Sequence, residues 1–463
     1  MFSKDIYQKR RNALKASVKQ GIALFLGNVD SPMNYPGNIY PFRQDSSFLY
    51  FFGLDHPGFA AIIDFDENKE IIFGNDVEID DIIWMGPQPS VKDMAAEFGV
   101  ETVMPFSKLA DYISTAKNRA RKIHFLPSYR AESKLTLEAL LDIKAADLKA
   151  YASVELIKAV VNLRNIKSAE EIVHIEDIMD VAYEMHTTSM RMAHEGVWER
   201  EIAGTIEGIA LKHGGVVSFP VILSKRGETL HNHSHGNLLR NGDLLLTDAG
   251  FESPWHYATD HTRTFPVGGK FSTRQREIYE IVLAANNAVH RNVKPGIFYK
   301  EMHYLAATTI FDGLKSLGLV KGDTTQAVAD GAHTLFFPHG LGHMMGMDVH
   351  DMEDLGENFV GYGDELERST QFGTAYLRLA RKLQPGFVLT NEPGIYFIPA
   401  LIDKWKAEGI NSQYINFDKV DSYRDFGGIR LEDDILITET SGRNLGRRRI
   451  PIEVDEVEAM INS

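Results

Sequence analysis

PHGLGHMMGMDVHD, residues 338–351, does more than any other stretch of this sequence to decide the fold. It places His343 in an apolar, glycine-rich segment, and four further apolar segments each carry an acid. Those segments are LLLTDAG (244–250), YATDHTRTF (257–265), VLTNEPGIYF (388–397) and GGIRLEDDILIT (427–438), and the acids are Asp248, Asp260, Glu392 and Glu432. Carboxylates are rarely fully buried unless something compensates their charge. The set therefore predicts a buried pair of metal ions, because two bridged ions readily use four carboxylates.

The alternation of residues in these segments predicts how the acids meet. Side chains along a strand alternate between its two faces, so every second residue shares a face. The residues expected to share a face are Leu244 and Leu246 with Asp248, Thr262 and Thr264 with Asp260, Val388 and Thr390 with Glu392, and Arg430 and Asp434 with Glu432. Residues 250–257 contain Ser253-Pro254 and predict a hairpin loop. We therefore expect acids on neighbouring strands to meet across strand pairs.

Composition excludes several classes of function. The net charge of −15 argues against a nucleic-acid partner, because no basic stripe is present to displace counterions. The absence of cysteine removes disulfides, thiolate metal sites and cysteine nucleophiles, and it is typical of a reducing compartment. The N-terminal MFSKDIYQKRRNALKASVKQ lacks the features of a signal peptide, and no apolar run is long enough to span a bilayer. We expect a cytoplasmic protein with no membrane partner.

Two domains are expected in 463 residues, and we place their boundary at about residue 160. Residues 1–160 alternate short apolar strands with helices, which indicates an α/β domain. The strand candidates are IALFLGN (22–28), FLYFFGL (48–54), FAAIIDF (59–65), EIIFG (70–74) and KIHFLP (122–127). Ser168 followed by Glu171 forms a capping-box pattern, which predicts the start of a long helix in a second domain, residues 161–463.

The metal-site segments resemble the signatures of the pita-bread metallopeptidases, specifically the proline-specific branch that holds aminopeptidase P and prolidase. The similarity is almost position for position in PHGLGHMMGMDVHD, LQPGFVLTNEPGIYFI and FGGIRLEDDILIT. YPFRQDSSFLYFFGLDHPG (40–58) resembles the front domain of the same proteins. The resemblance implies an α/β N-terminal domain and an α+β pita-bread catalytic domain. It also implies a dimetal exopeptidase that hydrolyses the Xaa-Pro bond of dipeptides or at the N-terminus of short peptides.

The resemblance implies a role for each metal ligand. Asp248 would hold one ion and His343 the other, while Asp260 and Glu432 would bridge the two. Glu392 would be both a ligand and the acid/base group of the reaction. A set of hard carboxylate oxygens with one imidazole favours manganese, with cobalt, iron or zinc able to substitute.

The resemblance also implies residues that contact the substrate. His350 and His231 match histidines that contact substrate and stabilise the oxyanion, and His339 matches a further pocket histidine. Arg430 matches an arginine that braces the metal carboxylates. Arg378, in GTAYLRLARKLQPGF (373–387), matches the prolidase arginine that binds the free carboxylate of a dipeptide, which favours a dipeptidase slightly over an aminopeptidase.

Other pita-bread proteins supply the alternative interpretations. A methionine-aminopeptidase-like enzyme shares the fold but usually lacks such a front domain. Creatinases share the two-domain plan without metals, and some family members are non-catalytic binding modules that have lost ligands. Retention of all the ligands argues against both of these. Because family members are often dimers, we also expect a homo-oligomer, by analogy a dimer.

Overall fold

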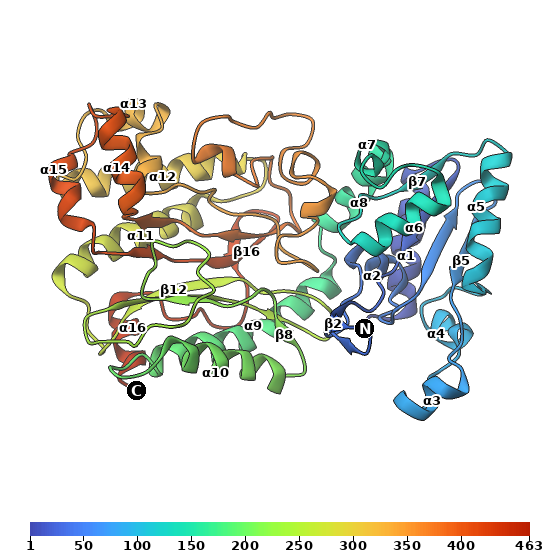
Figure 1. Ribbon diagram of the computed structural model, residues 1–463. Coiled ribbons are helices and arrows are strands. Elements are labelled where there is room, and N and C mark those ends of the chain that lie inside the picture. Colours follow the sequence, from blue (N-terminus) through green and yellow to red (C-terminus); the bar gives the residue numbers. More distant parts are fainter. The chain divides into compact units, whose positions relative to one another are not determined.

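The computed structural model describes residues 1–463, and its chain divides into two compact units (Figure 1). Unit 1 comprises Met1–Arg164 and Met352–Phe359, and unit 2 comprises Asn165–Asp351 and Val360–Ser463. No helix combines the length and the apolar character that crossing a membrane requires.

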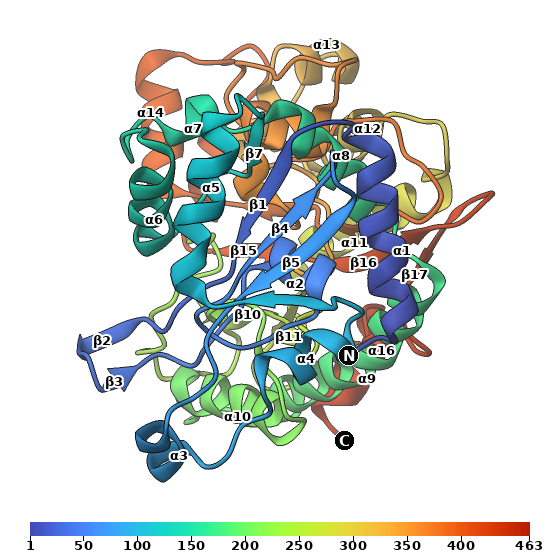
Figure 2. The same cartoon turned by 90° about the vertical axis from the view of Figure 1, so that its right-hand side faces the viewer.

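Unit 1 is built on a mixed five-stranded sheet in the order β6-β5-β4-β1-β7 (Figure 2). The strands are β1 (Ile22–Leu26), β4 (Ala60–Asp64), β5 (Lys69–Phe73), β6 (Thr102–Met104) and β7 (Ile123–Phe125). The helices are α1 (Lys4–Ser17), α2 (Ser46–Phe52), α3 (Ile79–Met85), α4 (Val91–Glu97), α5 (Leu109–Asn118), α6 (Ala131–Leu141), α7 (Leu148–Tyr151) and α8 (Val154–Asn165). A small hairpin, β2 (Pro32–Tyr35) and β3 (Asn38–Ile39), completes the unit. Four of the strand candidates are confirmed, as β1, β4, β5 and β7.

The fifth strand candidate, residues 48–54, is wrong, because these residues lie mostly in helix α2. Asp45 caps the helix by accepting a hydrogen bond from the backbone N–H of Phe48, and Gly53 ends it in a left-handed conformation. Every residue of α2 is buried, so no polar face marks a helical period. A short run of aromatic residues with no polar face looks the same in a buried strand.

Unit 2 arranges antiparallel strands between long helices. The strand pairs are β10 (Leu244–Ala249) with β12 (His261–Pro266) and β9 (Ile222–Ser224), β13 (Val388–Asn391) with β16 (Asp433–Ile437), β16 with β17 (Gly442–Asn444), β14 (Gly394–Tyr396) with β15 (Gly428–Arg430), and β8 (Val216–Val217) with β11 (Phe251–Glu252). In Figure 1, α9 (Ala169–Arg191) and α10 (Glu199–Lys212) run along one side of these strands, and α12 (Tyr299–Ser316) runs along the other. The remaining helices are α11 (Thr273–Asn292), α13 (Thr324–Ala329), α14 (Pro399–Glu408), α15 (Phe417–Val420) and α16 (Val454–Ile461).

Two local predictions about unit 2 are confirmed. Helix α9 begins at the expected capping box, in which the Ser168 hydroxyl accepts from the backbone N–H of Glu171 and the Glu171 carboxylate accepts from the N–H of Ser168. Strands β10 and β12 form the expected hairpin, with Asp248 opposite Thr262 and Leu246 opposite Thr264. Because side chains alternate along each strand, Asp260 lies on the same face as Thr262, next to Asp248.

Candidate active site

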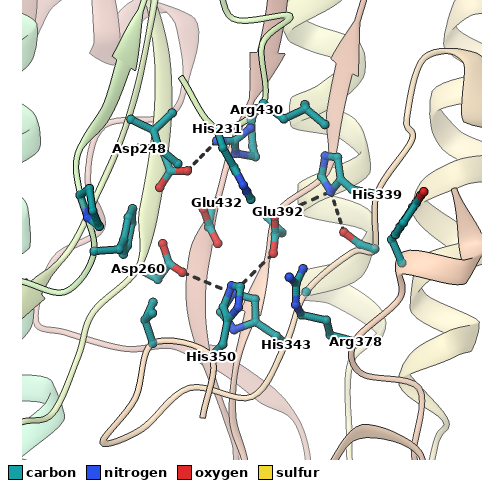
Figure 3. A pocket seen from close by; sticks show the side chains of 18 of the residues that line it. His231, Asp248, Asp260, His339, His343, His350, Arg378, Glu392, Arg430 and Glu432 are labelled. Atoms are coloured by element: carbon teal, nitrogen blue, oxygen red, sulfur yellow. Dashed lines mark hydrogen bonds and ion pairs between the residues drawn. The ribbon is translucent and has the colours of Figure 1, made fainter. Parts of the chain in front are cut away.

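One cavity of about 330 Å³ in unit 2 brings together every site residue predicted from the sequence (Figure 3). The carboxylates reach it from the ends of different strands: Asp248 from β10, Asp260 just before β12, Glu392 just after β13 and Glu432 between β15 and β16. Its wall also includes apolar side chains, among them Phe219, Ile222 and Leu230. The cavity therefore joins a charged floor to an apolar wall.

Asp260, His343 and Glu432 form the centre of the charged floor. Their ligand atoms lie within 4.8 Å of one another, and each residue is buried. His343 Nε2 lies 3.3 Å from Asp260 Oδ2. Glu432 Oε2 accepts a hydrogen bond from Thr262 Oγ1 at 2.7 Å. Three groups of this kind at this spacing can share one divalent ion.

Asp248 and Glu392 stand on either side of this centre (Figure 3). Asp248 Oδ2 accepts from Arg430 Nη2 at 2.6 Å, whereas its buried Oδ1 has no hydrogen-bond partner. Glu392 Oε1 accepts from Thr390 Oγ1 at 3.3 Å and lies 3.7 Å from His343 Nε2. Asp248 thus contributes to the cavity a carboxylate oxygen that no protein group satisfies.

The electrostatics of the cluster fit divalent cations. The pKa values of Asp248, Asp260, Glu392 and Glu432 are all raised, and burial is the main cause. For Asp260 the pKa rises to about 6. Neighbouring carboxylates add to the shift; for Glu432 these are Asp260, Glu392 and Asp248. Bound cations would keep these crowded acids ionised at neutral pH, and the unpartnered Asp248 Oδ1 is an acceptor that a cation would satisfy.

His343 is held in the tautomer that a metal ligand needs. Its Nδ1 donates a hydrogen bond to the carbonyl of Met344 at 3.0 Å, so Nε2 is left as a lone pair facing the carboxylates. The backbone allows this approach because Gly342 lies against the backbone of Thr390, where a Cβ would collide with the Thr390 carbonyl. The backbone N–H of His343 also donates to Thr390 Oγ1 at 3.1 Å.

A hydrogen-bonded chain that the sequence did not predict joins the metal carboxylates to His339. Arg430 donates from Nη2 to Asp248 and from Nη1 to the hydroxyl of Tyr396, at 2.9 Å. That hydroxyl lies 2.9 Å from His339 Nε2, and His339 Nδ1 lies 2.8 Å from the Gly340 carbonyl. Burial, followed by the charge of Arg430, lowers the pKa of His339 to about 3. His339 is therefore neutral and accepts from Tyr396, a residue whose only sequence signal is its position four residues after Glu392.

The remaining predicted residues line the same cavity. The ring of His350 lies 4.1 Å from that of His343, centroid to centroid, with 60° between their planes. His231 lines the cavity from a more exposed position. Arg378 is half-buried, and Figure 3 shows its side chain directed towards Glu392.

One prediction about this region is wrong. Asp434 does not share the cavity with Arg430 and Glu432; its Oδ2 instead accepts from the backbone N–H of Asp260 at 3.0 Å. The alternation fails because β15 ends at Arg430 and β16 begins only at Asp433. Asp434 therefore supports Asp260 from behind.

Comparisons with known proteins give the same result over both units. Residues 173–439 match metallopeptidase family M24, and residues 7–124 match the aminopeptidase P N-terminal domain. Human Xaa-Pro dipeptidase is 31% identical over 428 residues, which cover 90% of this chain and 84% of that protein. The Xaa-Pro aminopeptidase of Escherichia coli is 31% identical over 470 residues, covering 99% and 98%. A variant of E. coli aminopeptidase P, solved in complex with substrate, is 30% identical, with a TM-score of 0.82 and coverage of 100% and 98%.

Proposed function

This chain belongs to metallopeptidase family M24, in the proline-specific branch that holds aminopeptidase P and prolidase, and on that premise we propose how its residues cleave the Xaa-Pro bond. Its fold is the predicted one, an aminopeptidase P-type N-terminal domain with a pita-bread catalytic domain. The enzyme is a metallo-exopeptidase that hydrolyses Xaa-Pro bonds in dipeptides or at the N-terminus of short peptides. The observation that carries the account is the single cavity that gathers all the expected ligands and histidines.

Two divalent ions, in our proposal manganese, bind to this cluster. By family resemblance, Asp248 would hold one ion and His343 the other, Asp260 and Glu432 would be ligands common to both, and Glu392 would be a further ligand. The hard oxygen donors and the single imidazole support manganese over softer metals. Bound ions of this kind polarise the scissile carbonyl and lower the pKa of the attacking water.

Glu392 is the proton carrier. A peptide bond to proline has no N–H, and its leaving group is a ring nitrogen that must be protonated as the C–N bond breaks. Glu392 takes a proton from the attacking water and delivers one to that nitrogen. Its position supports this role, because Glu392 lines the cavity beside the other proposed ligands, with Oε1 3.7 Å from His343 Nε2.

His350 and His231 stabilise the negative charge that develops on the carbonyl oxygen. Their position on the cavity wall supports the proposal, since both can donate an N–H into the space above the carboxylates. His339 contacts substrate as a neutral ring, and Arg430 holds the carboxylate of Asp248 in place.

We expect His350→Ala to lower kcat by about 10²–10³-fold, as loss of an oxyanion donor commonly does. KM should rise much less, because the contact strengthens only as charge develops. Steady-state kinetics on an Xaa-Pro dipeptide with saturating manganese measure both constants. A change confined to KM would instead make His350 a residue that only positions the substrate.

Arg378 is proposed to bind the free carboxylate of a dipeptide, which makes dipeptides the preferred substrates. A guanidinium can pair with a carboxylate through two hydrogen bonds, and such a contact marks where the substrate must end. The position of Arg378 on the cavity wall, and the relatives that are dipeptidases, support this assignment. The relatives that are aminopeptidases support the alternative, cleavage of longer peptides.

Arg378→Ala should therefore reduce kcat/KM for Xaa-Pro dipeptides by tenfold or more, while Xaa-Pro-Yaa tripeptides lose little. A matched Arg378→Lys variant keeps the positive charge without the planar guanidinium. Its kcat/KM for dipeptides should lie between those of the wild type and Arg378→Ala. Side-by-side assays of a dipeptide and its tripeptide extension decide the question. Equal losses on both, or no loss on either, would favour an aminopeptidase.

We also propose that the enzyme is a homo-oligomer, by family analogy a dimer. Helix α3 supports this, because Ile79, Ile83, Trp84 and Met85 on its surface are 69%, 69%, 86% and 68% exposed. Large apolar side chains gathered on one exposed element commonly mark a protein–protein contact. The cysteine-free sequence supports the expected cytoplasmic location.

A further inference from the structure

We propose that Lys167 and Asp351, neither of which lines the cavity, are positioning residues that set the geometry of His343 and His350. Their ion pair fixes one end of the turn of residues 344–351. His343 directly precedes this turn, and His350 is its last residue but one. The inference rests on the proposed function, because it takes His343 as a metal ligand and His350 as a substrate contact.

The ion pair lies in the interior of unit 2. Lys167 Nζ is 3.0 Å from Asp351 Oδ2, and each side chain is only 1% exposed. Taking two charges out of water costs about as much as their attraction returns, so a buried pair is a weak means of stabilising a fold. A buried pair can instead select one arrangement of the chain over others. Because Asp351 is the last residue of the turn of residues 344–351, this pair can select one conformation of that turn.

The first consequence of the pair is the orientation of His343. The backbone N–H of Asp351 donates to the carbonyl of Met344 at 2.9 Å. The same carbonyl accepts the Nδ1–H of His343 at 3.0 Å, and a carbonyl oxygen has two lone pairs for two such donors. Holding Asp351 therefore holds the acceptor that fixes the His343 tautomer. His343 Nε2 is then left facing Asp260 at 3.3 Å and Glu392 at 3.7 Å.

The second consequence is the position of His350, which directly precedes Asp351 in the chain. The hydrogen bond from the N–H of Asp351 to the carbonyl of Met344 closes the turn, which brings His343 and His350 side by side. Their ring centroids lie 4.1 Å apart. A shift of Asp351 would displace both rings together.

Lys167 is itself anchored to the strand that leads to Glu392. Its backbone N–H donates to the carbonyl of Gly386 at 2.9 Å, two residues before β13 begins. The other end of the turn is tied to the same strand, because the N–H of Met345 donates to the carbonyl of Val388 at 3.0 Å. The pair thus fixes the turn of residues 344–351 relative to β13, the strand that leads to Glu392.

Gly346 gives the ion pair its space. A Cβ at this position would lie 2.6 Å from Asp351 Oδ2 and 2.9 Å from Lys167 Cε. Any larger residue would push the two charged groups apart or displace the turn. Gly346, in the MMGMD segment, is therefore needed for the ion pair to form next to the turn.

The test separates positioning from folding by removing both charges at once. Lys167→Met alone leaves a buried carboxylate uncompensated, so it should lower the melting temperature strongly. The double variant Lys167→Met with Asp351→Asn keeps both shapes without either charge and should recover most of that stability. We nevertheless expect the double variant to bind Mn²⁺ about 10–100-fold more weakly, the usual effect of losing a residue that orients a ligand, and to show a lower kcat.

Calorimetric titration of metal-free protein with Mn²⁺, thermal melting and steady-state kinetics supply the readouts. The control is Arg121→Met with Asp64→Asn, which removes an ion pair of unit 1 between the buried Asp64 and the partly exposed Arg121 and should leave Mn²⁺ affinity unchanged. A stable double variant with wild-type Mn²⁺ affinity and kcat would overturn the inference. Should that variant fail to fold, Gly346→Ala presses on the intact pair without changing charge, and unchanged Mn²⁺ affinity and kcat would overturn the inference equally.

The Mn²⁺ titration also distinguishes failure of the positioning role from failure of the proposed function. If the wild-type enzyme cleaved no Xaa-Pro peptide, the proposed function would fail, yet the Mn²⁺ affinities would still decide whether the pair orients His343. If the wild type cleaved its substrate and the variants bound Mn²⁺ normally, only the positioning role would be lost.

Discussion

Substitution of Glu392 with glutamine is expected to lower the rate of Xaa-Pro hydrolysis by at least about 10²–10⁴-fold. Glutamine has nearly the same shape, but it cannot carry a proton from water to the proline nitrogen, and it removes one negative charge from the metal site. The protein should remain folded, because the substitution relieves repulsion among carboxylates whose pKa values burial already raises. Hydrolysis of an Xaa-Pro dipeptide by metal-loaded protein measures the effect.

Glu458→Gln is a matched control, because it makes the same chemical change at a buried glutamate that pairs with Lys270 outside the cavity. It should change kcat little. Metal content must be measured in parallel, so that loss of the proton carrier is distinguished from loss of an ion. A soluble, metal-loaded Glu392→Gln enzyme with nearly full activity would show that Glu392 is not the proton carrier.

Local alternation predicted how Asp248 and Asp260 meet, because it depends only on neighbouring residues. The position of Asp248 opposite Thr262, with Asp260 on the same face, follows from period-two geometry once the two strands are recognised. The rule failed between β15 and β16, where tertiary contacts interrupt the strand. The N–H of Leu431 donates to the carbonyl of Pro393, and that of Glu432 donates to the carbonyl of Thr262. No pattern within residues 427–438 announces this break.

Contacts between distant residues were the part that the sequence could not predict. Lys167 and Asp351 are 184 positions apart, and nothing in either segment indicates its partner. The hydroxyl of Tyr396 joins Arg430 to His339, yet its segment predicts only a buried strand. The aromatic run in α2 shows the same limit for secondary structure, since its caps at Asp45 and Gly53 decide the helix while its apolar residues do not. The resemblance to a family supplied roles for residues, but it could not supply these supporting contacts.

Removal of divalent ions is expected to abolish hydrolysis and to destabilise the protein. Metal-free protein retains four acids around one cavity with Arg430 as their nearest permanent positive charge. Ions that bind only the folded state stabilise it, by about 2.7 kcal/mol when the free ion is at 100 times its Kd. Exhaustive dialysis against a chelator should therefore lower the melting temperature and activity together, and added Mn²⁺ should restore both. Full activity in rigorously metal-free protein would contradict the dimetal assignment.

The stability of the metal-free protein should fall as pH rises. Most carboxylates in folded proteins have the opposite effect, because their pKa is lowered on folding. Burial raises the pKa of Asp260 from 3.8 to about 6, so between these values the folded state binds more protons than the unfolded chain. Stability then falls as pH rises through this range, and the raised pKa of Glu432 extends the fall to higher pH. Bound Mn²⁺ keeps the carboxylates ionised and removes this dependence. Melting temperatures of metal-free and Mn²⁺-loaded protein from pH 4 to 8 should therefore diverge as pH rises, and parallel curves would mean that these acids do not share an ion.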